Sequence, residues 1–475
     1  MSKNYDLVIL GGGMGGYVAA IRAKQLGLSV ALVEEKLIGG TCLHQGCIPT
    51  KTLLKSASIY QTILNSQKFG IESSRPKIDF STIQKRKKQV VEQLFQGLQF
   101  LMKKNQIDIY QGFGRLLGPS IFSPMPGAIS VQYADTKENT ILIGEQVIIA
   151  TGTKTIELES LPFDGEFILS SDDALLLEEL PESITIVGGG VIGVEWASML
   201  NDFGVDVTLV ESESHLLPSF DQDLSNAIEK EFKQKGINIL TDTLVVTTDQ
   251  KNQDHVTVHL KQKESEHTIQ SSKVLVAIGR KANVNDIGIE NTSIELSQAG
   301  FIKVNEYYQT KESHIYAVGD CIGGQQLAHV AAHEGKMAVE HMTDLTEKLA
   351  QSTYAPSCVY SQPEIATVGL SEQEVMDKKI NYQTKKLSFS SIGKALVNGN
   401  DSGFIKMIID QDTNDLIGVH MVGEQVTELI SEAGLAMLLD ATATEIGLAI
   451  HPHPSLSEAI QEVALAVDNQ PIHTI

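Results

Sequence analysis

Cysteine is scarce in this sequence, with only four residues among 475. The N-terminus also lacks the charged region, long apolar region and small-residue cleavage site of a secretory signal. Both absences favour a reducing, cytoplasmic compartment, in which structural disulfides are rare. Two of the four cysteines, Cys42 and Cys47, nevertheless lie close together in the stretch GGTCLHQGCIPTK. A catalytic or metal-binding role explains this pair better than a structural disulfide does.

Basic residues are also few, 37 against 59 acidic residues, which gives a formal net charge of −22. A surface this negative repels nucleic acid and anionic membranes, so we expect neither as a partner. It would suit a partner with a segment rich in Lys and Arg, although simple solubility explains the charge equally well. No apolar run reaches the roughly 18 uncharged residues that a membrane-spanning helix needs. The apolar content of 42% and mean hydropathy of −0.02 are typical of a globular protein.

One pattern occurs twice in the chain. Each copy is a short apolar strand, a G-x-G-x-x-G turn, an amphipathic helix and a second strand that ends in Glu. In such a turn the first glycine permits a tight bend, the second lets the backbone approach a pyrophosphate, and the third lets the helix pack on the sheet. The copies are LVILGGGMGGYVAAIRAKQLGLSVALVE at 7–34, with Gly11, Gly13, Gly16 and Glu34, and ITIVGGGVIGVEWASMLNDFGVDVTLVE at 184–211, with Gly188, Gly190, Gly193 and Glu211.

The repeated pattern predicts two dinucleotide sites, and glycine-rich packing turns are the alternative. The carboxylate at the end of each copy is expected to accept a hydrogen bond from the adenosine ribose. At the second site, Glu211 favours NAD over NADP, because a carboxylate there repels a 2′-phosphate.

The rest of the chain predicts further helices and strands of the two dinucleotide-binding folds, followed by one additional domain. Residues 77–105 predict a helix, and buried strands are expected at 147–152, 274–280 and 314–320. From about residue 350 the glycine-turn pattern stops. Strand-like runs (FIKMII, LIGVHMV) and helices near 424–440 and 456–467 then predict a third domain of the α+β class.

A zinc site at the cysteine pair is disfavoured. Zinc usually needs two further Cys or His ligands at matching spacing, but Cys321 and Cys358 stand alone and His44 has no second His nearby. A dithiol beside a flavin, by contrast, is a two-electron relay whose active species is the thiolate. Lys51 follows Cys47 by one helical turn, so it faces the same site or is an exposed helix lysine.

The stretch HPHPSLSE at 451–458 offers His451, His453 and Glu458. A histidine whose second ring nitrogen is oriented by a carboxylate acts as a general acid and base near neutral pH. A lone histidine is usually structural, but two between prolines and followed by Glu favour a functional role.

Taken together, GGTCLHQGCIPTK, both glycine motifs, AVGD, YSQPEIATVGLSE and HPHPSLSE resemble the flavin-dependent disulfide reductases over essentially the whole chain. The resemblance is strongest to members that oxidise dihydrolipoamide for 2-oxo acid dehydrogenase complexes. It implies an α/β fold with two Rossmann-like dinucleotide-binding domains, for FAD and NAD, and a C-terminal α+β dimerisation domain. The implied borders are 1–150 for the first part of the FAD domain, 151–279 for the NAD domain, 280–347 for the second part of the FAD domain, and 348–475 for dimerisation.

The resemblance also assigns roles by position. Cys42 would exchange with substrate, Cys47 would face the flavin, and His453, oriented by Glu458, would be the acid and base. That histidine would act on the other subunit of a homodimer. Lys51 would lie by the flavin, ion-paired with Glu195, and no metal is implied. The FAD residues would be Gly11, Gly13, Gly16, Glu34, Lys51, Gly114, Gly152, Asp320 and Ala328, and the NAD residues would be Gly188, Gly190, Gly193, Glu211, Val245 and Gly279.

The implied partners are the lipoyl domain and the subunit-binding domain of an acyltransferase (E2) core. The stretches IFSP and IHPHPSLSE are similar to bacterial forms that serve branched-chain oxidation. No lipoyl-bearing domain is expected before residue 1. One rival function is an NADPH-dependent reductase of a small disulfide, which Glu211 disfavours. The other is a non-catalytic scaffold or thiol sensor that keeps FAD for stability, which the intact set of Cys42, Cys47, His453 and Glu458 disfavours. Because no cysteine follows Cys358, reductases with a C-terminal cysteine relay are disfavoured as well.

Two stretches depart from the pattern of the resembled family. ATGTKTIELESLP lacks the usual proline, which leaves the flavin contacts around Lys154 open. His44 and Gln45 replace an Asn and a small apolar residue between the cysteines, with an open effect on the redox potential.

Overall fold

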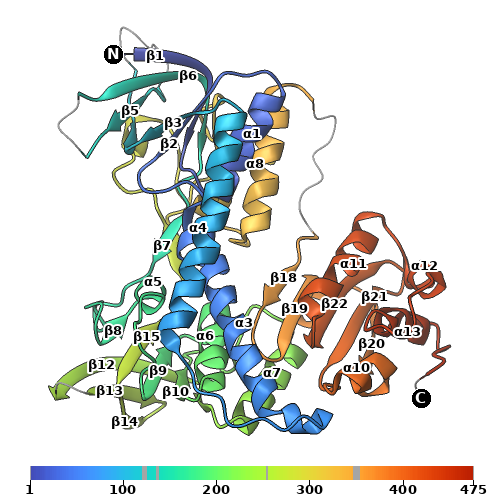
Figure 1. Ribbon diagram of the computed structural model, residues 1–475. Helices are drawn as coiled ribbons and strands as arrows, with labels where there is room; N and C mark the ends of the chain where they lie inside the picture. Colours follow the sequence, from blue (N-terminus) through green and yellow to red (C-terminus); the bar gives the residue numbers. More distant parts are fainter. Residues whose placement is uncertain (1, 120–125, 135–137, 253–254, 346–353, 474–475) are drawn as a thin grey trace. The chain divides into compact units, whose positions relative to one another are not determined.

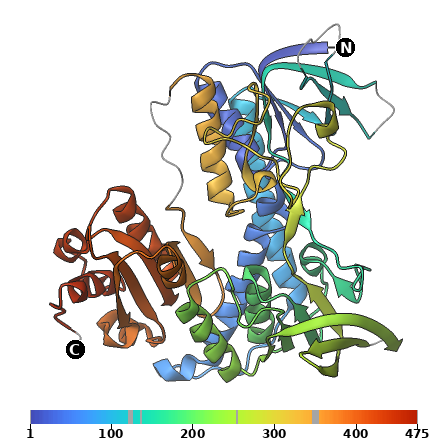
Figure 2. The same cartoon turned by 180° about the vertical axis from the view of Figure 1, so that it is seen from behind.

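The computed structural model describes residues 2–119, 126–134, 138–252, 255–345 and 354–473 (Figures 1 and 2). The chain forms two compact units. The first comprises Met1–Thr52, Lys85–Ile156 and Gly279–Ser352, and the second comprises Leu53–Gln84, Glu157–Ile278 and Thr353–Ile475. Among the described residues, no helix is both long enough and apolar enough to cross a membrane.

The first unit is built on a seven-stranded sheet in the order β3-β2-β1-β6-β5-β4, with β17 paired to β6. Strands β1, β2, β3, β6 and β17 run parallel, whereas β5 and β4 extend the sheet as antiparallel strands. Their parallel core is apolar on both faces, as βαβ strands covered by helices require. The strands are β1 (Ser2–Leu10), β2 (Val30–Glu34), β3 (Asp108–Gln111), β4 (Phe113–Leu116), β5 (Ile129–Gln132), β6 (Thr140–Ile149) and β17 (Ile315–Ala317).

Helices α1 (Met14–Gln25) and α8 (Ala328–Met342) lie side by side on this unit (Figure 1). Small residues allow their close approach, since a Cβ at Gly335 would collide with the Gly15 carbonyl. The unit also holds α2 (Gly40–His44) and a small antiparallel pair, β7 (Thr153–Thr155) with β16 (Arg280–Ala282). Two long helices belong to both units in sequence, α3 (Cys47–Leu64) and α4 (Phe80–Lys104).

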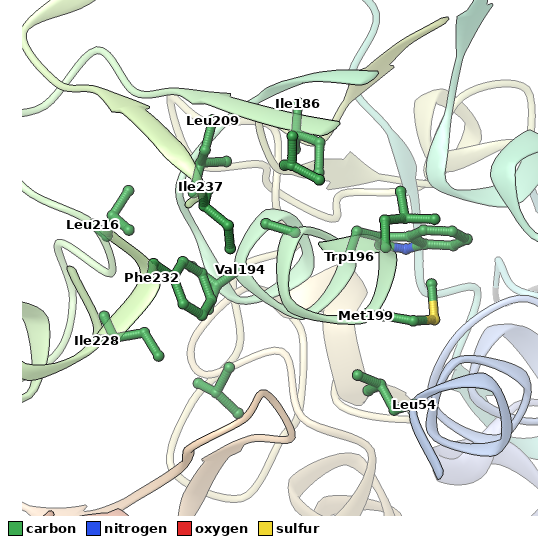
Figure 3. Close-up of a cluster of buried hydrophobic side chains, with 14 of the residues drawn as sticks. Leu54, Ile186, Val194, Trp196, Met199, Leu209, Leu216, Ile228, Phe232 and Ile237 are labelled. Carbon is green, nitrogen blue, oxygen red and sulfur yellow. The ribbon is translucent and has the colours of Figure 1, made fainter. Parts of the chain in front are cut away.

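The second unit contains a five-stranded parallel sheet in the order β11-β10-β9-β15-β8. Its core gathers around α6 (Val191–Asp202), where Val194, Trp196 and Met199 pack among aliphatic side chains (Figure 3). The other elements are β8 (Ile168–Leu169), α5 (Ser171–Ala174), β9 (Ser183–Val187), β10 (Asp206–Val210), α7 (Gln222–Gln234), β11 (Asn238–Leu240), β15 (Lys273–Val276), and an antiparallel sheet of β12 (Thr243–Asn252), β13 (His255–Gln262) and β14 (Ser265–Ser271).

The C-terminal part of the same unit is an antiparallel sheet in the order β18-β19-β22-β21-β20 with its own apolar core. Helices α11 and α13 cover it, as the α+β prediction expects. The elements are β18 (Ser357–Val359), β19 (Glu364–Gly369), α9 (Glu372–Asp377), β20 (Tyr382–Ser388), α10 (Gly393–Asn398), β21 (Phe404–Asp410), β22 (Leu416–Gly423), α11 (Val426–Leu438), α12 (Ala443–Leu448) and α13 (Glu458–Val467).

The fold class predicted from the sequence is confirmed, with two parallel α/β sheets and a C-terminal α+β part. The expected helix over 77–105 is α4, and the helices near 424–440 and 456–467 are α11 and α13. Helix α12 was missed, because six residues are too short to show a helical period. The domain borders at 150/151 and 279/280 stay predictions, and the border at 347/348 lies outside the described residues.

Candidate redox active site

The first glycine loop connects β1 to α1. Gly11 has a φ of +108°, and a Cβ there would collide with the Ala150 carbonyl. A Cβ at Gly16 would collide with the Gly11 carbonyl, so this glycine lets α1 start close to the strand. At Gly13, by contrast, the nearest atom to a Cβ would be Gly40 Cα at 4.0 Å. The protein therefore leaves open space at the position where the backbone is expected to approach a pyrophosphate.

The second glycine loop, between β9 and α6, repeats this geometry. Gly188 has a φ of +109° and lies against the Ala277 carbonyl, and Gly193 lies against the Gly188 carbonyl. No atom lies within 4 Å of a Cβ built at Gly190. The two loops thus agree in backbone conformation, in packing and in the position of their open space.

The two glutamates that end the repeats hold these loops in place. Glu34 accepts a hydrogen bond from the Gly12 N–H at 2.7 Å, and Glu211 accepts one from the Gly189 N–H at 2.5 Å. The other oxygen of each carboxylate accepts from the N–H two residues further on, at 2.8 Å in both cases. A carboxylate oxygen has a second lone pair, so the predicted ribose contact remains compatible with this bracing.

The cysteine pair adjoins the first glycine loop. The Gly39 N–H, at the start of α2, donates to the Gly12 carbonyl at 2.7 Å. Cys42 lies within α2 and Cys47 begins α3. A hydrogen bond with Cys47 and then burial raise the pKa of Cys42, while the positive charge of Lys51 acts in the opposite direction. The N-terminal end of α3 favours negative charge at Cys47.

The two unusual residues between the cysteines stabilise the turn that separates them. His44 Nε2 lies 2.9 Å from the Ile38 carbonyl oxygen, and the imidazole meets the Phe95 ring edge-on at 5.2 Å. The Gln45 N–H donates to the Thr41 carbonyl at 2.8 Å. His44 therefore ties α2 to the segment before it and to α4.

Asp320 belongs to a polar cluster on the same unit. It accepts a hydrogen bond from Thr153 Oγ1 at 2.8 Å, and Thr153 Oγ1 accepts one from Arg280 Nε at 2.8 Å. Glu334 of α8 accepts from the Gly319 N–H at 2.6 Å. Burial raises the pKa of Glu334 to about 7, and the charge of Asp320 adds to the effect. None of these neighbours of Asp320 was predicted from the sequence, because no local motif distinguishes them from other polar residues.

The residues that remain on the first unit fit a large bound cofactor. Gly152 has open space around its α-carbon, and Ala328 begins α8. Two polar atoms of the same region, Thr151 Oγ1 and Gln326 Nε2, are buried and have no hydrogen-bond partner among the described residues. Buried polar groups are nearly always satisfied, so unpartnered atoms here indicate a ligand rich in polar atoms. Gly114 differs from this group, because a Cβ there would collide with core side chains, so its glycine serves packing.

Lys154 lies on β7 opposite Lys281 of β16 and is exposed. Backbone pairing with β16 holds Thr153–Thr155, which belong to the stretch ATGTKTIELESLP that lacks the expected proline.

Three further residues were predicted from the sequence, two to bind NAD and one to pair with Lys51. Val245 lies on β12, packed at the edge of an apolar cluster, and Gly279 lies in the turn between β15 and β16. Glu195 is buried in α6 and accepts a hydrogen bond from the Tyr360 N–H at 3.0 Å. Lys51 and Glu195 belong to different units, so their ion pair stays a prediction.

The two histidines of HPHPSLSE differ in environment. The side chain of His453 is 79% exposed, its Nδ1 lies 2.7 Å from Glu458 Oε1, and its Nε2 has no partner among the described residues. The side chain of His451 is 5% exposed and pairs with Glu432. Burial acts to raise the pKa of Glu458, but the hydrogen bonds from His453 and Ser455 outweigh it and lower that pKa. His453 is therefore the histidine with an exposed ring nitrogen, and Glu458 holds its other nitrogen.

No group of three or more His, Cys, Asp or Glu side chains suited to a metal ion occurs within the part of the chain that the structure describes. Two cysteines in contact with each other can support thiol–disulfide exchange.

Comparison with protein families matches residues 5–335 to the pyridine nucleotide-disulphide oxidoreductases and residues 355–464 to the dimerisation domain of the same family. The chain belongs to the pyridine nucleotide-disulphide oxidoreductase family. Membership confirms the resemblance seen in the sequence, the oxidoreductase class, and FAD and NAD as cofactors. The dimerisation domain supports the homodimer. The roles assigned to individual residues stay predictions.

The chain is similar to known proteins over nearly all of its length. A dihydrolipoyl dehydrogenase of Bacillus subtilis is 53% identical over 100% of both chains. The mitochondrial dihydrolipoyl dehydrogenase of Pisum sativum is 35% identical over 99% of this chain and 93% of its own. Among solved structures, LpdA from Mycobacterium tuberculosis superposes with a TM-score of 0.90 at 27% identity, covering 97% of this chain and 99% of LpdA. The HOCl-induced flavoprotein disulfide reductase RclA from Escherichia coli gives 0.84 at 26% identity, covering 98% and 100%.

Proposed function

We propose that this protein is a dihydrolipoyl dehydrogenase, which oxidises protein-bound dihydrolipoamide to lipoamide and reduces NAD+ to NADH. The observation that carries the proposal is the contact of Cys42 with Cys47 directly beside the first glycine loop. That contact supports a two-electron thiol pair beside the predicted FAD site. The names of the Bacillus subtilis and Pisum sativum relatives support the choice of substrate.

The reaction begins with the protein in its disulfide form. His453 Nε2 accepts a proton from one dihydrolipoyl thiol, and the thiolate attacks Cys42 Sγ, which breaks the Cys42–Cys47 bond. The second dihydrolipoyl thiol then displaces Cys42 from the mixed disulfide. Lipoamide leaves with its disulfide formed, and Cys42 and Cys47 hold the two electrons as a dithiol.

In the proposed cycle, side chains of the protein orient the acid–base histidine, favour the thiolate at the cysteine pair and select the nucleotide. Glu458 holds the His453 ring so that Nε2 stays available. Lys51 places positive charge near Cys42, which favours the thiolate. FAD, when bound, supplies the electron transfer between the dithiol and NAD+. Glu211 favours NAD+ as the acceptor, since it would repel the 2′-phosphate of NADP+.

The proposed partners are the lipoyl domain and the subunit-binding domain of an E2 acyltransferase core. The net charge of −22 suits a partner surface rich in Lys and Arg. A branched-chain 2-oxo acid complex is our choice among the possible complexes, from the stretches IFSP and IHPHPSLSE. IFSP, at 121–124, lies outside the described residues. We place the reaction in the cytoplasm, where reducing conditions suit a cycling dithiol.

Steady-state assays test the proposal. The protein is expected to oxidise dihydrolipoamide with NAD+, and Cys42→Ser is expected to lower kcat by at least about 10³-fold, because no disulfide can form. Cys42→Ser should still oxidise NADH with an artificial electron acceptor, which requires no thiol pair. The matched control is Cys358→Ser, a cysteine of the C-terminal sheet, which should keep full activity. Turnover only with NADPH and glutathione disulfide would refute the substrate, and full turnover of Cys42→Ser would refute the thiol relay.

A further inference from the structure

The geometry points to His451 as a positively charged positioning residue that, with Glu432, fixes the segment carrying His453. This inference rests on the proposed function, because His453 is the acid and base of that reaction. His451 itself would touch neither substrate nor cofactor.

Both ring nitrogens of His451 face hydrogen-bond acceptors. Nε2 lies 2.7 Å from Glu432 Oε1, and Nδ1 lies 3.0 Å from the Ala449 carbonyl oxygen. Neither a carboxylate nor a backbone carbonyl can donate, so both nitrogens must donate. A neutral imidazole has one N–H and would leave one of these contacts without a proton. The arrangement is therefore satisfied only by imidazolium, whose charge Glu432 neutralises.

The ion pair has the burial and the anchoring that a positioning role needs. The side chain of His451 is 5% exposed, whereas that of Glu432 on α11 is 37% exposed. Gln461 of α13 donates to the carbonyls of Gly447 and Ala449 at 3.1 and 2.9 Å. The segment before His453 is therefore held from both sides, by α11 through His451 and by α13 through Gln461.

His453, two residues further on, has a different set of neighbours. Its Nδ1 faces Glu458 at the start of α13, and Glu458 in turn accepts from the Ser455 N–H at 2.9 Å. His473 also contributes positive charge at Glu458. With Nδ1 donating to Glu458, the exposed Nε2 can take up and release a proton. The two histidines thus have different roles. His451 keeps a proton on both ring nitrogens and fixes the segment that carries His453, while His453 takes up and releases a proton at Nε2.

The charge state of His451 is tested by NMR on the FAD-containing dimer with 15N-labelled histidine. Near neutral pH both ring nitrogens of His451 should give N–H signals, assigned by their loss in His451→Gln. A neutral His451 ring in the wild-type protein would overturn the inference without touching the proposed function.

Kinetics test the positioning role. Glu432→Gln keeps the shape of the side chain but removes its charge, and we expect kcat for dihydrolipoamide to fall about tenfold, since misplacing a catalytic group is costly. KM should stay within about twofold, because Glu432 pairs with His451 and is expected to act on the position of His453 and not on substrate binding. NADH oxidation with an artificial acceptor should be unchanged, since it does not use His453.

The matched control is His259→Gln, which removes the exposed His259–Asp249 pair, at 2.8 Å, on the β12–β13 hairpin. It should leave kcat unchanged. Full kcat in Glu432→Gln would overturn the positioning role. If the wild-type protein itself failed to oxidise dihydrolipoamide, the proposed function would fall, and the NMR result would still decide the charge state.

Discussion

Single side chains in this protein combine a structural contact with a functional one. Glu34 and Glu211 hold their glycine loops through backbone N–H groups and remain able to bind a ribose. Glu334 accepts the Gly319 N–H and thereby fixes the turn that carries Asp320. Its carboxyl is buried and lies near another carboxylate, so ionising it is costly.

The raised pKa of Glu334, about 7 against an ordinary 4.5, predicts a dependence of stability on pH. Folding favours the protonated form, so this contribution is fully present below pH 4.5 and is lost as pH rises through about 7. Glu334→Gln removes the titration. Between pH 5 and pH 8 the wild-type protein should lose up to about 3 kcal/mol more unfolding free energy than Glu334→Gln does. Urea unfolding at both pH values measures this difference.

The control for that comparison is Glu306→Gln, an exposed glutamate of the same unit. It should lose stability with pH as the wild type does. Equal pH dependence in all three proteins would contradict the raised pKa of Glu334.

At the scale of elements, each nucleotide site is a strand, a turn and a helix in which the three glycines have separate tasks. Two of the three are required by packing within the protein, at Gly188 and Gly193 in the second copy. Gly190 is different, because it has an ordinary φ of −74° at the N-cap of α6 and no neighbour within 4 Å of its Cβ position. Packing within the protein therefore does not require glycine at this position, and we expect its lack of a side chain to matter for the ligand.

We therefore expect Gly190→Ala to fold normally and to bind NAD poorly. Its unfolding free energy should change by less than about 1 kcal/mol, while the KM for NAD+ should rise at least about tenfold, because a methyl group would occupy the pyrophosphate position. The FAD content, read from the flavin absorbance, should stay at the wild-type level.

The equivalent change in the first loop, Gly13→Ala, is the matched control. It should lower the FAD content and leave the second loop intact. Loss of FAD in Gly190→Ala, or an unchanged KM for NAD+, would contradict the separate roles of the two loops.

At the scale of the whole molecule, the cysteine pair lies on one compact unit and the His453–Glu458 pair on the other. The match to a dimerisation domain covers the segment that contains His453. A homodimer in which each subunit supplies the histidine for the other's cysteines is the arrangement that we expect.

Mixed dimers test this arrangement. Cys42→Ser and His453→Gln should each be inactive toward dihydrolipoamide alone. After subunit exchange, half of the dimers are hybrids with one intact site each, so about a quarter of the wild-type activity should return. Mixing either variant with itself is the control. If mass spectrometry shows that hybrid dimers have formed but no activity returns, His453 acts within its own subunit.

The sequence alone was sufficient for the motifs in which residues close together in the chain act together. The two G-x-G-x-x-G copies predicted both dinucleotide folds, because the tight turn, the close backbone approach and the helix packing each need glycine at a fixed position. The spacing in GGTCLHQGCIPTK and HPHPSLSE identified the thiol pair and the histidine–glutamate pair, because both act over a few residues. The resemblance to a family then supplied the expected roles.

Only the tertiary structure could decide which distant groups meet. Glu334 and Thr153 beside Asp320, Phe95 against His44, and Glu432 beside His451 are brought together by packing of separate elements, and sequence spacing carries no record of such contacts. The same packing separates the two histidines of HPHPSLSE, which look equivalent in the sequence. Burial and the pair with Glu432 of α11 fix His451, while the side chain of His453 stays exposed.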